Sequence, residues 1–179
     1  MRKGADGLRL VPGSDEHLAQ AWVEYQFRHS DTFPRFRYAP DEKWRRMYHT
    51  ILENKGKGSE FEQEVLKKLG HEKNTALLMP PPGREAQGFI PDAVPGNPHP
   101  GELVWGQPYH FVEAKAREEL ALTGNVKAML EYVREYGGHI ELWVRSAKHR
   151  EGPTRVSAPL RNALRALSAQ GKARLMQYP

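Results

Sequence analysis

The chain of 179 residues contains no cysteine, which excludes a disulfide framework, cysteine-bound zinc and thiol catalysis. It has no apolar stretch near the roughly 20 residues that cross a bilayer, and no apolar run follows the early basic residues, so we expect neither a membrane span nor a secretory signal. The eight histidines form no His-x-His or His-Glu-x-x-His pattern, so no local spacing predicts a histidine zinc site. We expect a soluble protein, and the sequence leaves its compartment open.

Acidic residues are scarce at the C-terminal end. Residues 142–179 carry eight Lys and Arg but one acidic residue, whereas residues 58–141 have a net charge of −5 and residues 1–57 of +3, within a total of +5. An acidic middle followed by a basic end indicates a polyanionic partner beside a carboxylate cluster. A solvated basic helix is the alternative reading of the same charges.

Residues 1–57 are predicted to form a helical N-terminal extension. Ser14 can cap a helix that runs to about His29, and Pro40-Asp41 opens a second helix with an apolar stripe. Because glycine is a poor helix former, the sequence Gly56-Lys57-Gly58 is expected to end the second helix. We therefore place a domain boundary after residue 57.

Residues 58–179 are predicted to form one domain in which helices and strands alternate. The proline-rich stretch 95–108 is expected to be a loop. The predicted order α-β-β-β-α-β-α-β indicates an α/β (α+β) fold with a mixed central sheet flanked by helices. Its elements are a helix over 60–69, strands over 74–79, 88–94 and 109–115, a helix ending at 136, a strand over 140–145, a helix over 158–170 and a strand over 173–178.

The clearest strand ends in two opposite charges. In Tyr109–Lys115 the side chains alternate, so Glu113 and Lys115 share a face with Phe111, about 6–7 Å apart along the backbone. His110 lies on the opposite face, for which we expect a structural role. A simple surface ion pair between Glu113 and Lys115 is the alternative.

Asp92 stands inside the apolar run Phe89–Val94. Pro91 cannot donate a ladder hydrogen bond, so the strand should bend or lie at an edge there. If this strand pairs with the next one across the 95–108 loop, Asp92 approaches Glu113. Two neighbouring carboxylates repel unless a cation or proton joins them, and Mg²⁺ is typically bound by one or two carboxylates with phosphate oxygens. A turn that exposes Asp92 is the alternative.

A third acid is indicated by helical periodicity. Glu62 falls within the apolar stripe of Phe61, Val65, Leu66 and Leu69, whereas Glu60 and Glu64 lie outside it. An inward carboxylate needs a metal, a proton or a cation because an unpaired buried charge is expensive. An ion pair with Lys or Arg would satisfy Glu62 without a metal.

Together these residues resemble the PD-(D/E)xK nucleases, which have the restriction-endonuclease-like fold. The resemblance rests on Pro91-Asp92 followed by Glu113-Ala114-Lys115, after a helix that bears Glu62, and covers roughly residues 58–178. Gly58–Glu62 and Gly137–Val144 resemble more narrowly the restriction-endonuclease-fold toxins at the C-terminal ends of bacterial polymorphic and secreted effectors. No glutamine stands in the following helix, unlike some subfamilies; Asn125 and Lys127 are its nearest polar candidates.

The resemblance implies a metal-dependent endonuclease with a restriction-endonuclease-like α-β-β-β-α-β core. Asp92, Glu113, Glu62 and the Ala114 carbonyl would hold Mg²⁺ or Mn²⁺, and Lys115 would orient water or stabilise charge on the phosphate. It further implies a DNase toxin, with DNA favoured over RNA, a cognate immunity protein as partner, and secretion into the cytoplasm of a target cell. The alternatives are a non-catalytic nucleic-acid-binding module on a degenerate nuclease fold and a repair, phage or mobile-element nuclease.

Basic residues near the C-terminus are the expected contacts to phosphate. Each phosphate that they neutralise would release counterions and make binding salt-dependent. The segment 35–38, Arg-Phe-Arg-Tyr, could stack on bases or serve as a structural connector. The predicted nucleic-acid-binding residues are Arg145, Lys148, Arg150, Arg155, Arg161 and Arg165, for each of which a solubilising role is the alternative.

Overall fold

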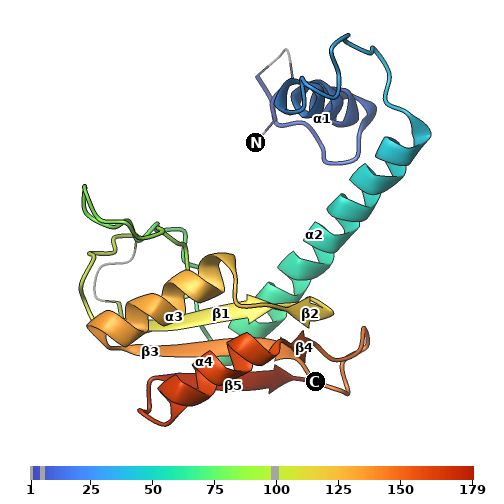
Figure 1. The fold of residues 1–179 in the computed structure, drawn as a ribbon. Coiled ribbons are helices and arrows are strands. Elements are labelled where there is room, and N and C mark those ends of the chain that lie inside the picture. The colour runs from blue at the N-terminus through green and yellow to red at the C-terminus, as the bar shows by residue number, and fades with distance from the viewer. Residues whose placement is uncertain (1, 5–6, 98–100) are drawn as a thin grey trace. The chain divides into compact units, whose positions relative to one another are not determined.

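The computed structural model describes residues 2–4, 7–97 and 101–179. The chain divides after Lys57 into two compact units, Met1–Lys57 and Gly58–Pro179. Among the described residues, no helix combines the length and the apolar character that crossing a membrane requires. The elements are α1 (Asp15–Arg28), α2 (Glu42–Leu69), β1 (His110–Lys115), β2 (Glu119–Leu120), α3 (Gly124–Tyr136), β3 (His139–Arg145), β4 (Arg155–Val156), α4 (Ala158–Ser168) and β5 (Ala173–Tyr178) (Figure 1).

The first unit is built around aromatic side chains. Helix α1 begins as predicted, with the Ser14 side chain accepting a hydrogen bond from the His17 amide at 3.2 Å. The backbone of Arg37 is fixed by two side chains of α1: Trp22 Nε1 donates to its carbonyl at 2.8 Å, and Gln26 Oε1 accepts from its amide at 2.7 Å. The segment 35–38 is therefore anchored as a connector. The buried aromatic residues of this unit are Trp22, Trp44 and Tyr48, with Tyr25 and Phe33 packed against them.

Helix α2 corrects the predicted break at Gly56-Lys57-Gly58. It runs without interruption from Glu42 to Leu69, so Ser59 is an interior residue rather than a cap. Two glycines weaken a helix by about 1 kcal/mol each relative to alanine. Buried apolar residues on both sides of the glycines, Trp44 and Tyr48 before them and Phe61 and Val65 after them, hold the helix in place, and tertiary packing outweighs propensity.

The second unit is a mixed helix-and-strand fold around a small sheet. Its three strands lie in the order β1-β3-β5 and are parallel throughout. One face packs on α3 and α4 through Phe111, Ile140 and Leu142, and the other packs on the C-terminal half of α2 through Val112 and Ala114. The predicted alternation of β1 is therefore confirmed.

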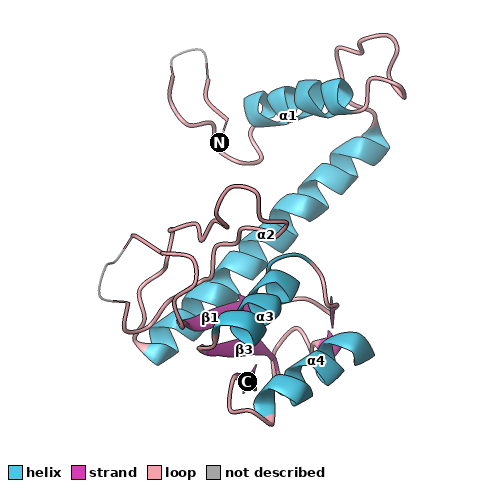
Figure 2. Ribbon diagram, turned by 60° about the vertical axis from the view of Figure 1, so that its left-hand side comes forward, coloured by secondary structure: helices cyan, strands magenta, loops and turns pink. Residues whose placement is uncertain are grey.

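The predicted strands over 74–79 and 88–94 do not form, so the sheet is smaller than predicted and is parallel rather than mixed. In their place are two isolated antiparallel bridges, Leu78 with Phe89 and Ala93 with Val112. Proline explains the shortening, because Pro80–Pro82 and Pro91 cannot donate ladder hydrogen bonds. In Figure 2 the described part of the segment between α2 and β1 is drawn as loop. Residues 98–100 of the predicted 95–108 loop lie outside the described residues.

A glycine pair sets the register of the sheet. Gly137 and Gly138 both have positive φ, and a Cβ on Gly138 would lie 2.1 Å from the Tyr109 carbonyl oxygen. Only glycine permits this approach. The next amide, His139 N–H, donates to that carbonyl at 2.9 Å, which places His139 beside His110 at the start of β1 and β3.

Candidate active site

The bridge between Ala93 and Val112 brings Asp92 beside Glu113. The two bridge residues exchange backbone hydrogen bonds at 3.1 and 2.9 Å. Asn74 fixes the approach, since its amide N–H donates to the Asp92 carbonyl at 2.8 Å and its side-chain nitrogen donates to the Pro91 carbonyl at 3.0 Å. The Ala93–Val112 bridge and the two hydrogen bonds from Asn74 therefore take the place of the predicted hairpin.

The two carboxylates are locked to the backbone that separates them. The Ala114 amide donates to Asp92 Oδ2 at 2.8 Å, and the Asp92 amide donates to Glu113 Oε2 at 3.3 Å. Asp92 therefore accepts a hydrogen bond from the residue that follows Glu113, and Glu113 accepts one from the backbone of Asp92. This reciprocal arrangement fixes both side chains before any ligand binds.

The Lys115 ammonium lies among three oxygen atoms. It is 3.8 Å from Asp92 Oδ2, forms an ion pair with Glu113 Oε1, and donates to the Ala114 carbonyl at 3.3 Å. Those oxygens belong to three of the residues that the sequence assigns to metal binding. The structure therefore shows a position for a positive charge, lined by two carboxylates and a carbonyl.

Burial disfavours two charged carboxylates at this position unless a cation compensates them. Glu113 is fully buried, and only 15% of the Asp92 side chain is exposed. The pKa of Glu113 is raised to about 7, chiefly by desolvation and also by the charge of Asp92, against the opposing effect of Lys115. The pKa of Asp92 is also raised, mainly by burial. One ammonium does not compensate both charges, which favours a further cation or a retained proton.

Glu62 points inward as predicted, and it is paired. Only 14% of its side chain is exposed, compared with 63% for Glu60, and it forms an ion pair with Lys73. Lys73 is a site residue that sequence reasoning missed. Its pKa is raised chiefly by the hydrogen bond to Glu62, and also by the charges of Asp92 and Glu113, so it belongs to the same electrostatic cluster.

The oxygen donors of the site fit a hard divalent cation, which Glu62 would hold only indirectly. Carboxylate and carbonyl oxygens are the ligands that Mg²⁺ and Mn²⁺ accept. Among the described residues, the oxygens of Glu62, Asp92 and Glu113 do not all converge within 4.8 Å of one another. Asp92, Glu113 and the Ala114 carbonyl would therefore be the direct ligands, and Glu62 would act through water or through Lys73.

The predicted phosphate contacts fall into two groups. Arg145 is buried and its Nη1 donates to Glu151 at 3.0 Å, so its guanidinium is engaged inside the protein rather than presented to solvent. Arg161 is exposed, and its guanidinium donates to the Val156 carbonyl at 2.9 Å. Lys148, Arg150, Arg155 and Arg165 are exposed.

One of these exposed residues, Arg150, lines a basic cavity of about 660 Å³. It is lined by Lys67 and Lys68 of α2 and by His149 and Arg150 of the loop after β3, with Glu64 as the one acid. Parallel strands carry their carboxyl ends to one edge of a sheet, so this loop begins at the same edge as Lys115. The basic surface and the carboxylates therefore lie at the same end of the sheet.

Comparison of the chain with models of protein families, with curated proteins and with solved structures finds no match. The family resemblance therefore stays a prediction.

Proposed function

We propose that the chain is a metal-dependent nuclease that hydrolyses phosphodiester bonds at the Asp92, Glu113 and Lys115 site. The observation that carries the proposal is the charge position defined by the Asp92 and Glu113 carboxylates and the Ala114 carbonyl around the Lys115 ammonium. Structural ion pairs are rarely this buried without full compensation, because desolvation outweighs the Coulomb energy. Ionisable groups whose pKa is shifted by burial and by a nearby like charge are typical of functional sites.

The residues divide the work of hydrolysis between them. A bound Mg²⁺ or Mn²⁺ would supply Lewis acidity and a water of lowered pKa. Asp92 and Glu113 are held ready to bind it by the Ala114 and Asp92 amides. Lys115, with 26% of its side chain exposed, donates hydrogen bonds at the mouth of the site. There it orients the attacking water or stabilises charge on the phosphate.

A polyanionic substrate fits the basic residues at the carboxyl end of the sheet. Lys67, Lys68 and Arg150 line the basic cavity, and Lys148 is exposed on the same loop. The narrower proposals are that the substrate is DNA, that the chain is the toxin domain of a secreted bacterial effector, and that an immunity protein inhibits it. They are supported by the motif resemblance of residues 58–178 alone.

The test is cleavage of supercoiled plasmid, linear DNA and RNA with Mg²⁺, with Mn²⁺ or with EDTA. We expect cleavage with either metal and none with EDTA. Asp92→Asn and Lys115→Ala should each lower the rate by about 10²–10³-fold, the usual loss when one charge-stabilising group is removed. Lys43→Ala, which removes an exposed lysine of α2, is the matched control and should cleave as wild type does.

Two outcomes would refute the proposal. Full cleavage by both Asp92→Asn and Lys115→Ala would place the chemistry elsewhere. Salt-dependent retention of DNA without turnover under any divalent metal would instead identify a binding module on a degenerate nuclease fold.

A further inference from the structure

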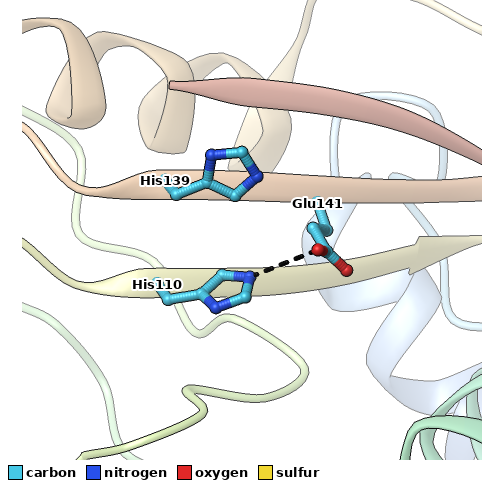
Figure 3. Close-up of side chains that lie close together, drawn as sticks. All are labelled: His110, His139 and Glu141. Atoms are coloured by element: carbon cyan, nitrogen blue, oxygen red, sulfur yellow. Dashed lines mark ion pairs between the residues drawn. The ribbon is translucent and has the colours of Figure 1, made fainter. Parts of the chain in front are cut away.

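Three metal-ligating side chains meet on the sheet away from the carboxylate site. His110 of β1 and His139 and Glu141 of β3 lie close together on the same side of two adjacent strands (Figure 3). One ligand atom from each lies within 4.8 Å of the other two, and His110 Nε2 is 3.7 Å from Glu141 Oε1. Among the described residues this is the only such group of three.

The parallel register creates this cluster. His110 pairs with His139, and Val112 pairs with Glu141. His139 and Glu141 are two residues apart on one strand, so they share a face. That face also carries Val112 and Trp143, which pack on α2, whereas Glu113 occupies the alternate position of β1. The cluster is therefore separate from the nuclease site.

The hydrogen bonds leave imidazole nitrogens ready to bind. His139 Nδ1 lies 2.9 Å from the Gly171 carbonyl oxygen. A carbonyl only accepts, so this nitrogen carries the proton and Nε2 keeps its lone pair. Such a backbone contact is the usual way in which a ligating histidine is oriented. In addition, His110 Nε2 is buried and lacks a hydrogen-bond partner.

We propose that His110, His139 and Glu141 bind a divalent transition-metal ion of the Zn²⁺ class, with solvent completing the coordination. Imidazole nitrogens select such ions over Mg²⁺ and Ca²⁺, and two histidines with one glutamate are an established zinc ligand set with an open position. Around a tetrahedral zinc ion the ligand atoms lie about 2.0–2.1 Å from the metal, and therefore closer to one another than the 4.8 Å within which these three atoms lie. The three side chains would rotate towards one another, on an unchanged backbone, to complete the site.

The neighbouring charges limit how tight this site can be. Arg174 pairs in register with Glu141, and both Arg174 and His71 act electrostatically on His110. A nearby guanidinium opposes a divalent cation and competes for the carboxylate. The Glu141 carboxylate is the group that offsets this repulsion, so its charge should matter as much as either imidazole.

The experiment is calorimetric titration of the full, tag-free chain with Zn²⁺ after chelator treatment. We expect one zinc ion per chain, bound by both imidazoles and the carboxylate. His110→Gln, His139→Gln and Glu141→Gln should each weaken binding at least tenfold. His49→Gln, which removes an exposed histidine of α2, should bind as wild type does. Circular dichroism of the metal-free variants confirms that each one folds.

A second titration separates this site from the nuclease site. Asp92→Asn should keep its zinc affinity, and bound Co²⁺ should give the visible absorption of low-coordinate cobalt with histidine ligands in wild type but not in His139→Gln. The inference does not rest on the proposed function. No zinc binding by wild type, unchanged binding in all three variants, or loss of binding in Asp92→Asn alone would overturn it.

Discussion

Replacing Glu113 by glutamine should stabilise the metal-free protein at high pH while abolishing cleavage. Glu113 is fully buried, and its pKa is raised from an ordinary 4.5 to about 7, chiefly by desolvation. Between these two values the folded carboxyl keeps a proton that the unfolded carboxyl has released. The native state then binds more protons than the unfolded state, so the free energy of unfolding falls as pH rises through this window.

The size of the effect follows from that window. Each pH unit is worth about 1.4 kcal/mol, so wild type should lose up to about 3 kcal/mol between pH 4.5 and pH 7, and little more above it. The side-chain amide of the Glu113→Gln variant does not titrate, and its oxygen can still accept the hydrogen bond from the Asp92 amide that Glu113 Oε2 accepts at 3.3 Å. The stability of Glu113→Gln relative to wild type should therefore increase by up to about 3 kcal/mol across the same range.

The assay is urea unfolding of both proteins in EDTA at about pH 4.5, 6 and 8, followed by circular dichroism. Comparing the difference between the two proteins removes titrations that they share. Adding Mg²⁺ at the highest pH should then stabilise wild type and leave Glu113→Gln unchanged, because the variant lacks one of the two carboxylates. If the difference in unfolding free energy between the two proteins is constant with pH, or moves against Glu113→Gln as pH rises, the reasoning is refuted. Glu113 would then not be a buried carboxyl whose charge is incompletely compensated.

Two further changes test the scaffold and the missed lysine. Gly138→Ala should destabilise the chain by about 2–3 kcal/mol in urea unfolding, because its Cβ would meet the Tyr109 carbonyl at 2.1 Å; Gly171→Ala, with positive φ but open space, should lose less, and equal losses would contradict the argument. Lys73→Met should lower the Mg²⁺ concentration for half-maximal cleavage severalfold, since it removes a positive charge beside the site and frees Glu62 from its ion pair. An unchanged or higher requirement would show that Lys73 does not compete with the metal.

Local signals predicted the elements that depend on neighbouring residues. The start of α1 at Ser14 follows from a cap, and the alternation of β1 follows from a period of two. The predicted span of β5, residues 173–178, is also the observed one. The sequence failed where distant packing decides. The glycines at 56 and 58 argue for a break, but apolar residues bury the helix on both sides of them. Whereas α2 is longer than predicted, the two predicted strands that lie next to or contain prolines are shortened to single bridges.

The candidate site shows the same division. Asp92 and Glu113 could be placed together from sequence because each is fixed by an apolar strand-like run, and one bridge suffices to join those runs. Lys73 could not be found this way. It lies in irregular chain after α2, where no period specifies which way a long flexible side chain turns. Only the finished fold shows that it meets Glu62.

The histidine cluster explains why an absent motif is weak evidence. A search for His-x-His or His-Glu-x-x-His tests ligands carried by one strand or one helix, whereas His110 and His139 stand on separate strands and meet through parallel pairing. The usable signal was indirect: His139-x-Glu141 places two ligands on one strand face, and Gly137-Gly138 marks where that strand begins. Adding the alternation of β1 puts His110 on the face opposite Glu113. The same alternation that places the Glu113 carboxylate on one side of β1 places His110 on the other, so this one strand would carry a ligand of each of the two proposed metal sites.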